Sequence, residues 1–334
     1  MNVDVTSAAT GELTDIVATA TRAPSMHNTQ PWRFRIIPAT DDSIEDAVIE
    51  VRGDPSRGLP VADPTGWATR VACGAAVLGV RLGIAVRGHR ADVSVLPDPS
   101  DPDLIARIRV AGPHSATPEE RELHTAIRHR RSNRRPFNDV PAAPGTGARL
   151  EAAARAEGAW LDVLDDLQRR ADVAAIVREG QDQLNADPAY RAELAAWVRN
   201  ASEDGVPKNA GGPSPAPYDL LAFRDFGTQP RAPGRDFEPN PLVCVLGTVT
   251  DHPGAQVHAG MALHGVLLAA TAAGLASSML SQPIELPDLR SRLRAALGRT
   301  GGWPQMVLRF GYGIPTPATP RRPVSDVLEI VPVS

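Results

Sequence analysis

Apolar and polar residues recur with helical and strand periods in turn along the chain, which predicts an α+β fold rather than a bundle or a sandwich. Strand-like segments alternate apolar residues with charge or form short buried runs, and helical segments place apolar residues three or four positions apart. The predicted helices are Leu13–Thr21, Pro118–Arg130 with Thr117 as N-cap, the first part of 150–164, and Leu167–Gly180. The predicted strands are Trp32–Ile37, Ala47–Gly53, the last part of 150–164, Pro241–Val249 and Met306–Gly313.

Two helix-like segments resemble each other. When Gly74–Gly88 is placed on Gly260–Gly274 without a gap, glycines, alanines, valines and leucines fall at equivalent positions. Each segment ends at a glycine suited to a C-cap, and a strand-like run follows it, ADVSVLPD in the first and SSMLSQP in the second. A duplicated unit explains this match better than chance does. We therefore expect two repeats, residues 1–115 and 116–334.

Residues 200–240 are rich in proline and glycine and have no regular period. So long a connection within a compact domain is usually a lid, a wrapping loop or a disordered insert. The apolar run Tyr218–Phe223 offers a surface for docking, so we expect a docked lid.

The charge pattern excludes several classes of partner. The chain of 334 residues has a net charge of −4, with Lys208 as its single lysine, so no general attraction to nucleic acid or anionic membrane is expected. His252–Ile284 has no charged residue, but its many small residues indicate a buried helix rather than a membrane span. The N-terminal segment has acidic residues and no apolar core of a signal peptide, so a cytoplasmic protein is expected.

Well-known catalytic signatures do not occur in the sequence. It has no GxxxxGK[ST], GxSxG or HExxH motif, and its two cysteines, Cys73 and Cys244, lie far apart. The eight histidines form no i, i+4 pair on a helix, so no protein-ligated metal is expected. These observations favour chemistry carried by an organic cofactor.

A basic segment, RHRRSNRRPF over Arg128–Phe137, follows a predicted helix. Forked donors come from Arg130, Arg131, Arg134 and Arg135 and a hydroxyl from Ser132, a set suited to a phosphate monoester. The alternative is a solvated helix end whose positive charge complements the helix dipole.

A second segment, ATRAPSMHNTQPWRF, contains two prolines that fix a loop. Ser25, Asn28 and Gln30 offer hydroxyl and amide groups that could bind the edge of a planar ring. The alternative is a turn-rich connection into the strand at Trp32. Further candidates are GLASSMLSQP (Gly274–Pro283) and the tail RFGYGIPTPATPRRP, whose Arg321 and Arg322 are either phosphate ligands or solvated.

These four segments together resemble the FMN-dependent nitroreductase family. APSMHNTQPWRF is similar to the family's loop beside the flavin, RRSNR to its phosphate-binding Arg-Arg-Ser-x-Arg, GLASSMLSQP to the segment facing flavin N5, and RFGY…RRP to its closing strand. The resemblance implies FMN as cofactor and NAD(P)H as electron donor, with no catalytic side chain because the flavin carries the electrons. The residues that it implies at the cofactor are Ser25, Asn28, Gln30, Arg130, Arg131, Ser132, Arg134, Leu280, Ser281, Gln282 and Arg321.

The order of the motifs differs from the usual one. In an ordinary nitroreductase the Arg-Arg-Ser run precedes the Pro-Ser…Asn loop, within a homodimer that has two flavins. Here the loop lies in the first repeat and the Arg-Arg-Ser run in the second, which resembles the tandem, Acg-like branch of the family. The resemblance implies an internal pseudo-dimer: a monomer with one complete site and a lid over the flavin.

The function that this implies is NAD(P)H-dependent reduction of nitroaromatics, quinones or similar acceptors. A different class of function is an FMN-storing protein with little turnover, since Ser281 and Gln282 stand where many members have an acid followed by glycine. A third is a structural pseudo-dimer that has lost flavin, which the retained phosphate residues make the weakest of the three. Turnover of NADH and NADPH with an added acceptor discriminates the first two.

Overall fold

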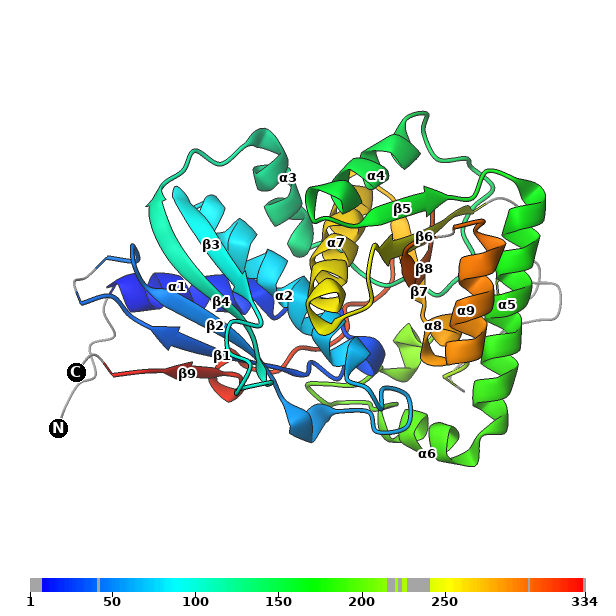
Figure 1. Cartoon of the computed structure of the whole chain (residues 1–334), viewed down its shortest axis with the longest axis horizontal. Coiled ribbons are helices and arrows are strands. Elements are labelled where there is room, and N and C mark those ends of the chain that lie inside the picture. Colours follow the sequence, from blue (N-terminus) through cyan, green and yellow to red (C-terminus); the bar gives the residue numbers. More distant parts are fainter. Residues whose placement is uncertain are drawn as a thin grey trace.

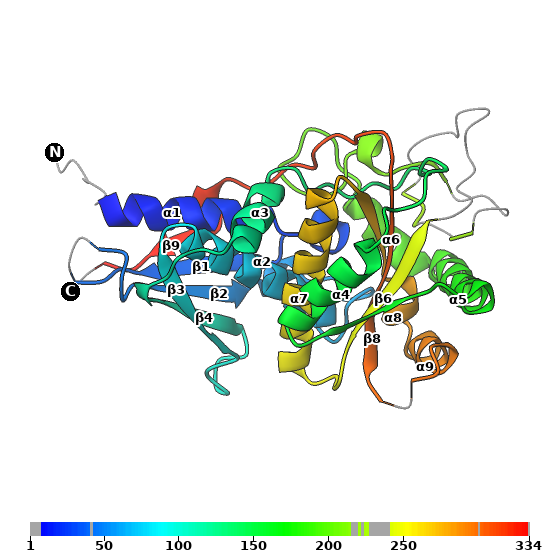
Figure 2. The same cartoon turned by 90° about the horizontal axis from the view of Figure 1, so that it is seen from above.

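Two β-sheets flank a central pair of helices, α2 (Trp67–Ala85) and α7 (Pro253–Ala272), in this computed structural model (Figures 1 and 2). The structure describes residues 8–40, 43–214, 220–221, 224–226, 241–299 and 301–332. The apolar run Tyr218–Phe223 of the expected lid therefore lies largely outside the described residues, and only Leu220 and Leu221 of it are described. The observed architecture is α+β, as the sequence predicts.

The first sheet lies on the side of α1 (Ala8–Ala20) and has the strand order β3-β4-β2-β1-β9. Its neighbouring strands are antiparallel except for the parallel pair β1 and β9. The strands are β1 (Trp32–Ile37), β2 (Val48–Gly53), β3 (His89–Val95), β4 (Leu104–Pro113) and β9 (Leu328–Ile330).

The second sheet has the order β5-β6-β8-β7, and all its neighbours are antiparallel. Its strands are β5 (Trp160–Val163), β6 (Leu242–Thr248), β7 (Ala276–Leu280) and β8 (Trp303–Gly311). The remaining helices are α3 (Pro118–Ile127), α4 (Thr146–Ala156), α5 (Leu167–Ala186), α6 (Pro188–Ala196), α8 (Gln282–Glu285) and α9 (Pro287–Ala296).

The two sheets share one connectivity. In each, two antiparallel strands precede a central helix and two more strands follow it. The last of these four strands lies between the strand just before the helix and the strand just after it. The resulting orders are β1-β2-β4-β3 and β5-β6-β8-β7. A helix precedes each unit, α1 in the first and α4 in the second. This match favours the duplication that the repeated helices predict, while the division at residue 115 stays a prediction.

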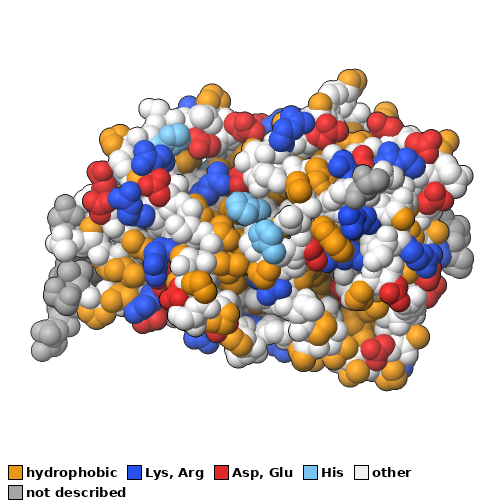
Figure 3. Space-filling view, viewed as in Figure 1, with side chains coloured by type: hydrophobic (Ala, Val, Ile, Leu, Met, Phe, Trp, Pro, Cys, Tyr) orange, Lys and Arg blue, Asp and Glu red, His pale blue; other side chains and the backbone are white. Residues whose placement is uncertain are grey.

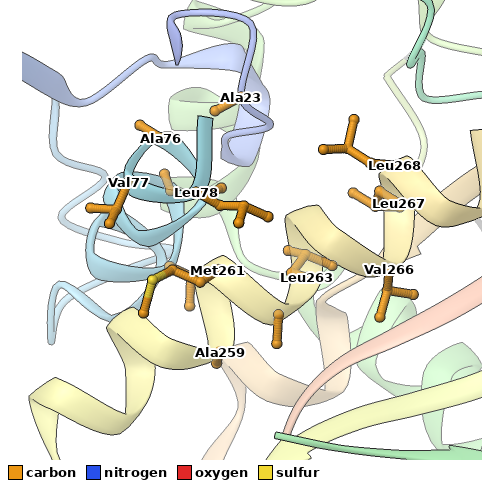
Figure 4. Close-up of a cluster of buried hydrophobic side chains, with 14 of the residues drawn as sticks. Ala23, Ala76, Val77, Leu78, Ala259, Met261, Leu263, Val266, Leu267 and Leu268 are labelled. Atoms are coloured by element: carbon orange, nitrogen blue, oxygen red, sulfur yellow. The ribbon is translucent and has the colours of Figure 1, made fainter. Parts of the chain in front are cut away.

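The central helices cross where each has a glycine. A Cβ atom on Gly74 would lie 2.1 Å from the carbonyl oxygen of Val257, and one on Gly260 would lie 2.1 Å from that of Val71. These glycines are equivalent in the sequence repeat, so each helix uses the same position to admit the other's backbone. Figure 4 shows apolar side chains of both helices, among them Leu78 and Met261, beside this crossing.

The C-terminal strand β9 belongs to the first sheet, although the strand that precedes it in the chain, β8, belongs to the second. β9 pairs in parallel with β1, with Phe34 opposite Leu328 and Ile36 opposite Ile330. The chain therefore returns from β8 across the molecule, and Figure 1 shows β9 beneath β1 at the far side from β8. The sequence does not predict this strand, because three residues in a proline-rich tail show no period.

Local sequence signals set several boundaries. Thr117 caps α3, accepting a hydrogen bond from the Glu120 amide at 3.1 Å while the Glu120 carboxylate accepts one from the Thr117 amide. α3 ends at Ile127, three residues before the predicted end at Arg130, so the basic segment is an extended loop. β1 spans the predicted residues, and Gly88 and Gly274 both have positive φ after the central helices, as C-caps require.

One described helix, α2, is long and apolar enough to cross a membrane, and 83% of its most apolar window is buried inside the protein. That burial is typical of a core helix. The uncharged stretch His252–Ile284, for which the sequence predicts a buried helix, contains α7 and β7, and the middle of α7 is buried. On the face seen in Figure 3, basic and acidic side chains are intermingled.

Candidate functional site

The loop between α1 and β1 has a strained backbone. His27, Asn28 and Gln30 have φ values of 49°, 55° and 52°, in the left-handed region that costs free energy for residues with a side chain. The Ser25 hydroxyl accepts a hydrogen bond from the Gln30 amide at 3.0 Å, which closes the loop on itself. Three such residues within four positions indicate a loop whose shape is imposed by its surroundings.

The amides of this loop bind two distant segments. Asn28 Nδ2 donates to the carbonyls of Gly205 at 2.9 Å and Pro320 at 3.1 Å, and Gln30 Nε2 donates to that of Glu203 at 2.9 Å. Both side chains are therefore engaged in holding the expected lid segment and the C-terminal tail to the loop. Neither lines the pocket described next, and their contact with a ring edge stays a prediction.

A pocket lies between the two central helices, this loop and β7. Its apolar part comes from α2 and α7 and from Met279 and Met306, while serine hydroxyls and two guanidinium groups supply the polar part. Four predicted site residues line it: Ser25, Ser132, Arg134 and Ser281. An apolar floor with a few polar groups suits a planar aromatic ring.

Two other predicted residues are buried behind this pocket. Leu280 and Gln282 are each 1% exposed, and Gln282 Nε2 donates to Gln181 Oε1 at 3.0 Å. Neither side chain lines the pocket. Ser281 between them does, and its hydroxyl accepts a hydrogen bond from Arg224 at 3.0 Å.

Arg130, Arg131 and Arg321 meet in a small adjoining cavity with Arg22, Ala318 and Thr319. Arg130 is 5% exposed, and its Nε and Nη1 atoms have no hydrogen-bond partner among the described residues. Burial, together with the charges of Arg131 and Arg134, lowers the pKa of Arg130 to about 10. Burial and the charge of Arg130 lower the pKa of Arg321 to about 9. A buried cluster of cations of this kind suits an anionic ligand.

The segment Arg130–Arg134 joins this cluster to the pocket. Ser132 pairs with Ser277 of β7, and the Asn133 amide donates to the Ser277 carbonyl at 2.7 Å. Arg130 and Arg131 therefore lie at the anion cavity while Ser132 and Arg134 line the pocket. Arg321 is fixed by bonds to the Thr21 carbonyl and to Asn28 Oδ1, both at 2.9 Å.

His264, on α7, is also near the cluster and is fully buried. Its Nδ1 is 2.6 Å from the Ala75 carbonyl oxygen, so the neutral ring donates there, and its Nε2 has no described partner. Burial and the nearby charges of Arg130 and Arg321 lower the pKa of His264 to about 3. The imidazole is therefore uncharged at neutral pH.

The pocket residues that were not predicted include His27, Arg224 and Phe226. Phe226 lies edge-on to the His27 ring at a centroid distance of 6.1 Å, and the Arg134 guanidinium carbon is 4.7 Å from the Phe226 ring centroid. His27 lies inside a predicted motif, so its position in the sequence could have identified it as a site residue. Arg224 and Phe226 are almost 200 residues farther along, in the expected lid, where no local pattern reports the contact. These described residues of the lid are docked on the pocket.

Comparisons with known proteins identify relatives of the chain. No family model matches the chain. A Mycobacterium tuberculosis H37Rv protein, provisionally named NAD(P)H nitroreductase, is 34% identical over 323 residues, covering 94% of this chain and 90% of its own. A second protein of that strain, provisionally named NAD(P)H nitroreductase acg, is 31% identical over 336 residues and covers 97% of both chains. The structure of a nitroreductase with bound FMN from Desulfitobacterium hafniense DCB-2 is 17% identical, with a TM-score of 0.40 over 63% of this chain and 98% of that one.

Proposed function

The chain belongs to the NAD(P)H nitroreductase family, and from that premise we propose that it is an FMN-dependent oxidoreductase that uses NAD(P)H to reduce nitroaromatics, quinones or similar acceptors. When bound, FMN supplies the transfer of electrons through its ring system. The protein's own residues bind the cofactor, orient it and exclude water. No side chain is assigned a proton-transfer role.

The observation that carries the proposal is the buried guanidinium of Arg130, whose Nε and Nη1 have no described partner. A buried charge without a counter-ion is costly, so the fold is expected to supply the anion by binding it. Arg130, Arg131 and Arg321 would hold the phosphate of FMN, and Ser132, which follows Arg131 in the chain, lines the adjoining pocket. Ser25 and Ser281 then line the ring pocket, where Asn28, Gln30, Leu280 and Gln282 support it from behind.

The storage function raised by the sequence has no support in the names of the relatives, which are those of reductases. Ser281 and Gln282 differ from the acid and glycine that many family members have at these positions, and the two side chains lie in different surroundings. Ser281 lines the pocket and Gln282 is buried beneath it. We therefore retain catalysis as the proposed function.

Purification and a flavin assay test this proposal directly. The protein is expected to be yellow and to release FMN, not FAD, on denaturation, as resolved by chromatography of the extract. NADH and NADPH oxidation is then followed with menadione or a nitrofuran as acceptor. Acceptor-dependent turnover is expected. Absence of flavin after reconstitution with FMN, or turnover below about one per minute with every acceptor, contradicts the proposal.

The proposal extends to assembly and location. We expect a monomer whose two repeats replace the two subunits of a dimer, with small-molecule partners only, and a cytoplasmic protein. The pseudo-symmetric counterpart of the pocket lies near Arg81 and Glu157, which form an ion pair at 2.6 Å. Because the Arg81 guanidinium is already paired with Glu157, it is not available to bind a phosphate, and a second FMN site is not expected there.

A further inference from the structure

The wall of the pocket that comes from the expected lid carries positive charge. Arg224 and Arg134 both line the pocket, and no carboxylate is among the described residues that line it. Glu285 binds the Arg224 guanidinium from behind, being 1% exposed at its side chain, while Arg224 is 9% exposed. The pocket surface is therefore cationic although one of its two cations has a buried counter-ion.

The two guanidinium groups are close enough to disfavour each other. Burial is the main cause that lowers the pKa of Arg134 to about 10, and the charge of Arg224 is the second cause. The Arg134 guanidinium also stacks on Phe226, and Arg224 lies 5.5 Å from the Tyr190 ring centroid. Arg224 has Glu285 as its counter-ion, whereas no ion pair of Arg134 occurs among the described residues, so a bound anion would relieve the repulsion between the two guanidinium groups.

His27 adds a polar atom that also lacks a described partner. Its ring is 4% exposed and lines the pocket, and its Nε2 has no hydrogen-bond partner among the described residues. Burial and the charges of Arg224 and Arg134 lower the pKa of His27, so the ring is neutral at pH 7. A neutral imidazole can donate one hydrogen bond to an anionic oxygen beside Arg224.

We propose that this wall makes the site selective for acceptors in which the aromatic or quinone ring carries an anionic group, such as a carboxylate, with Arg224 as the specificity-determining residue. The inference rests on the proposed function for the identity of the pocket and adds the charge of its substrate. Ser281 and Glu285 position Arg224, through a hydrogen bond of 3.0 Å and an ion pair respectively. Phe226 lines the same pocket, so an apolar surface is available to the ring of the acceptor.

The test compares benzoate with benzamide, which have nearly the same shape and differ in charge. Both are titrated calorimetrically into protein saturated with FMN, and neither is reducible, so binding is measured without turnover. Benzoate is expected to bind about tenfold more tightly, because one charge-assisted hydrogen bond contributes that much. Equal affinities for the two compounds would overturn the inference.

Variants assign the preference to Arg224. R224Q alone would leave the buried Glu285 without a partner, so the double variant R224Q/E285Q is used, which removes both charges and retains two amides that can pair. Its preference for benzoate is expected to fall to within about threefold. R81Q/E157Q is the matched control, because Arg81 and Glu157 form a similar ion pair away from the pocket. Loss of the preference in the control as well would overturn the role of Arg224.

The same comparison is extended to substrates, with para-nitrobenzoate and para-nitrobenzamide as the two acceptors. The wild type is expected to reduce the nitrobenzoate with the higher kcat/KM, and R224Q/E285Q is expected to lose this difference mainly because its KM rises for the anionic acceptor. Failure of the proposed function would be seen separately, as absent FMN or absent turnover. The benzoate comparison requires bound FMN but no turnover, so it can still be scored when turnover is absent, whereas absence of FMN would overturn the proposed function and this inference together.

Discussion

Arg130 is a residue whose charge the fold buries without supplying an anion from the described part of the chain. In the absence of ligand this arrangement destabilises the protein, since the guanidinium is desolvated and lies near Arg131 and Arg134. With a phosphate in place, the same group makes charge-assisted hydrogen bonds. The charge of Arg130 therefore lowers the stability of the ligand-free protein and strengthens the binding of an anion.

Replacing both phosphate candidates tests that opposition. Arg130→Ala with Ser132→Ala is expected to weaken FMN binding by several kcal/mol, at ~1.5–3 kcal/mol for each charge-assisted bond. The melting temperature without FMN is expected to stay level or rise, because a buried unpaired charge has been removed. Fluorescence titration with FMN and thermal melting measure the two effects. Arg121→Ala, on the exposed face of α3, is the control, and unchanged FMN affinity in the double variant would contradict the assignment.

His264 predicts a dependence of stability on pH. Its pKa is about 3 in the folded protein and about 6.5 in the unfolded chain, so unfolding takes up a proton between these values. The stabilisation is full above pH 6.5 and is lost as the pH falls through this window, by up to about 1.4 kcal/mol per pH unit. Urea denaturation at several pH values gives the free energy of unfolding as a function of pH, and the slope of this function is expected to be smaller for His264→Leu. The exposed His129→Leu should retain the wild-type slope, and equal slopes for all three would refute the argument.

Elements meet most closely at the crossing of α2 and α7, where Gly74 and Gly260 face the backbone of the opposite helix. The small residues that predict a repeat also predict this packing, because only glycine leaves room for a carbonyl at that distance. The sequence could therefore indicate both the helices and their mutual contact. It could not indicate β9, whose pairing with β1 depends on a strand far away in the chain.

A single methyl group tests the crossing. Gly260→Ala places a Cβ atom 2.1 Å from the Val71 carbonyl oxygen, so the helices must separate, at roughly 1–3 kcal/mol of unfolding free energy. Gly265→Ala on the same helix meets its nearest neighbours at 3.6 Å and is expected to stabilise by about 0.5–1 kcal/mol. Chemical denaturation of both variants measures the difference. Similar values for both would show that the crossing tolerates a wider spacing.

The loop after α1 shows what a motif predicts and what it leaves out. Its serine lines the pocket, in agreement with the motif, whereas its amides bind the carbonyls of Gly205, Pro320 and Glu203. Nothing local in the sequence indicates these partners, since they lie 173 to 292 residues away. The candidate site could thus be located from its motifs, but the hydrogen bonds that position it depend on the tertiary fold.

The candidate pocket has residues from both of the expected repeats. Ser25 comes from the first repeat, and Ser132, Arg134 and Ser281 come from the second. The chain is therefore expected to need no second subunit to complete the pocket. This arrangement agrees with the shared connectivity of the two sheets.

Stoichiometry tests this view of the molecule. One FMN per chain is expected from absorbance and protein concentration, with a monomeric mass by light scattering. The ratio should stay near one on dilution, because both halves of the site are covalently joined. Two flavins per chain, or release of flavin as an oligomer dissociates, would contradict the internal pseudo-dimer.

The return of the chain to β1 sets an order of events during synthesis. β1 ends at Ile37 and its parallel neighbour ends at Ile330, so at ribosomal rates of about 5–20 residues per second the edge of β1 waits roughly 15 to 60 s for its partner. Arg321 and the Pro320 carbonyl, which bind Asn28, emerge just before that strand. A nascent chain that lacks these residues has an open sheet edge and an incomplete anion site. The cofactor can thus be captured only after synthesis has passed Arg321.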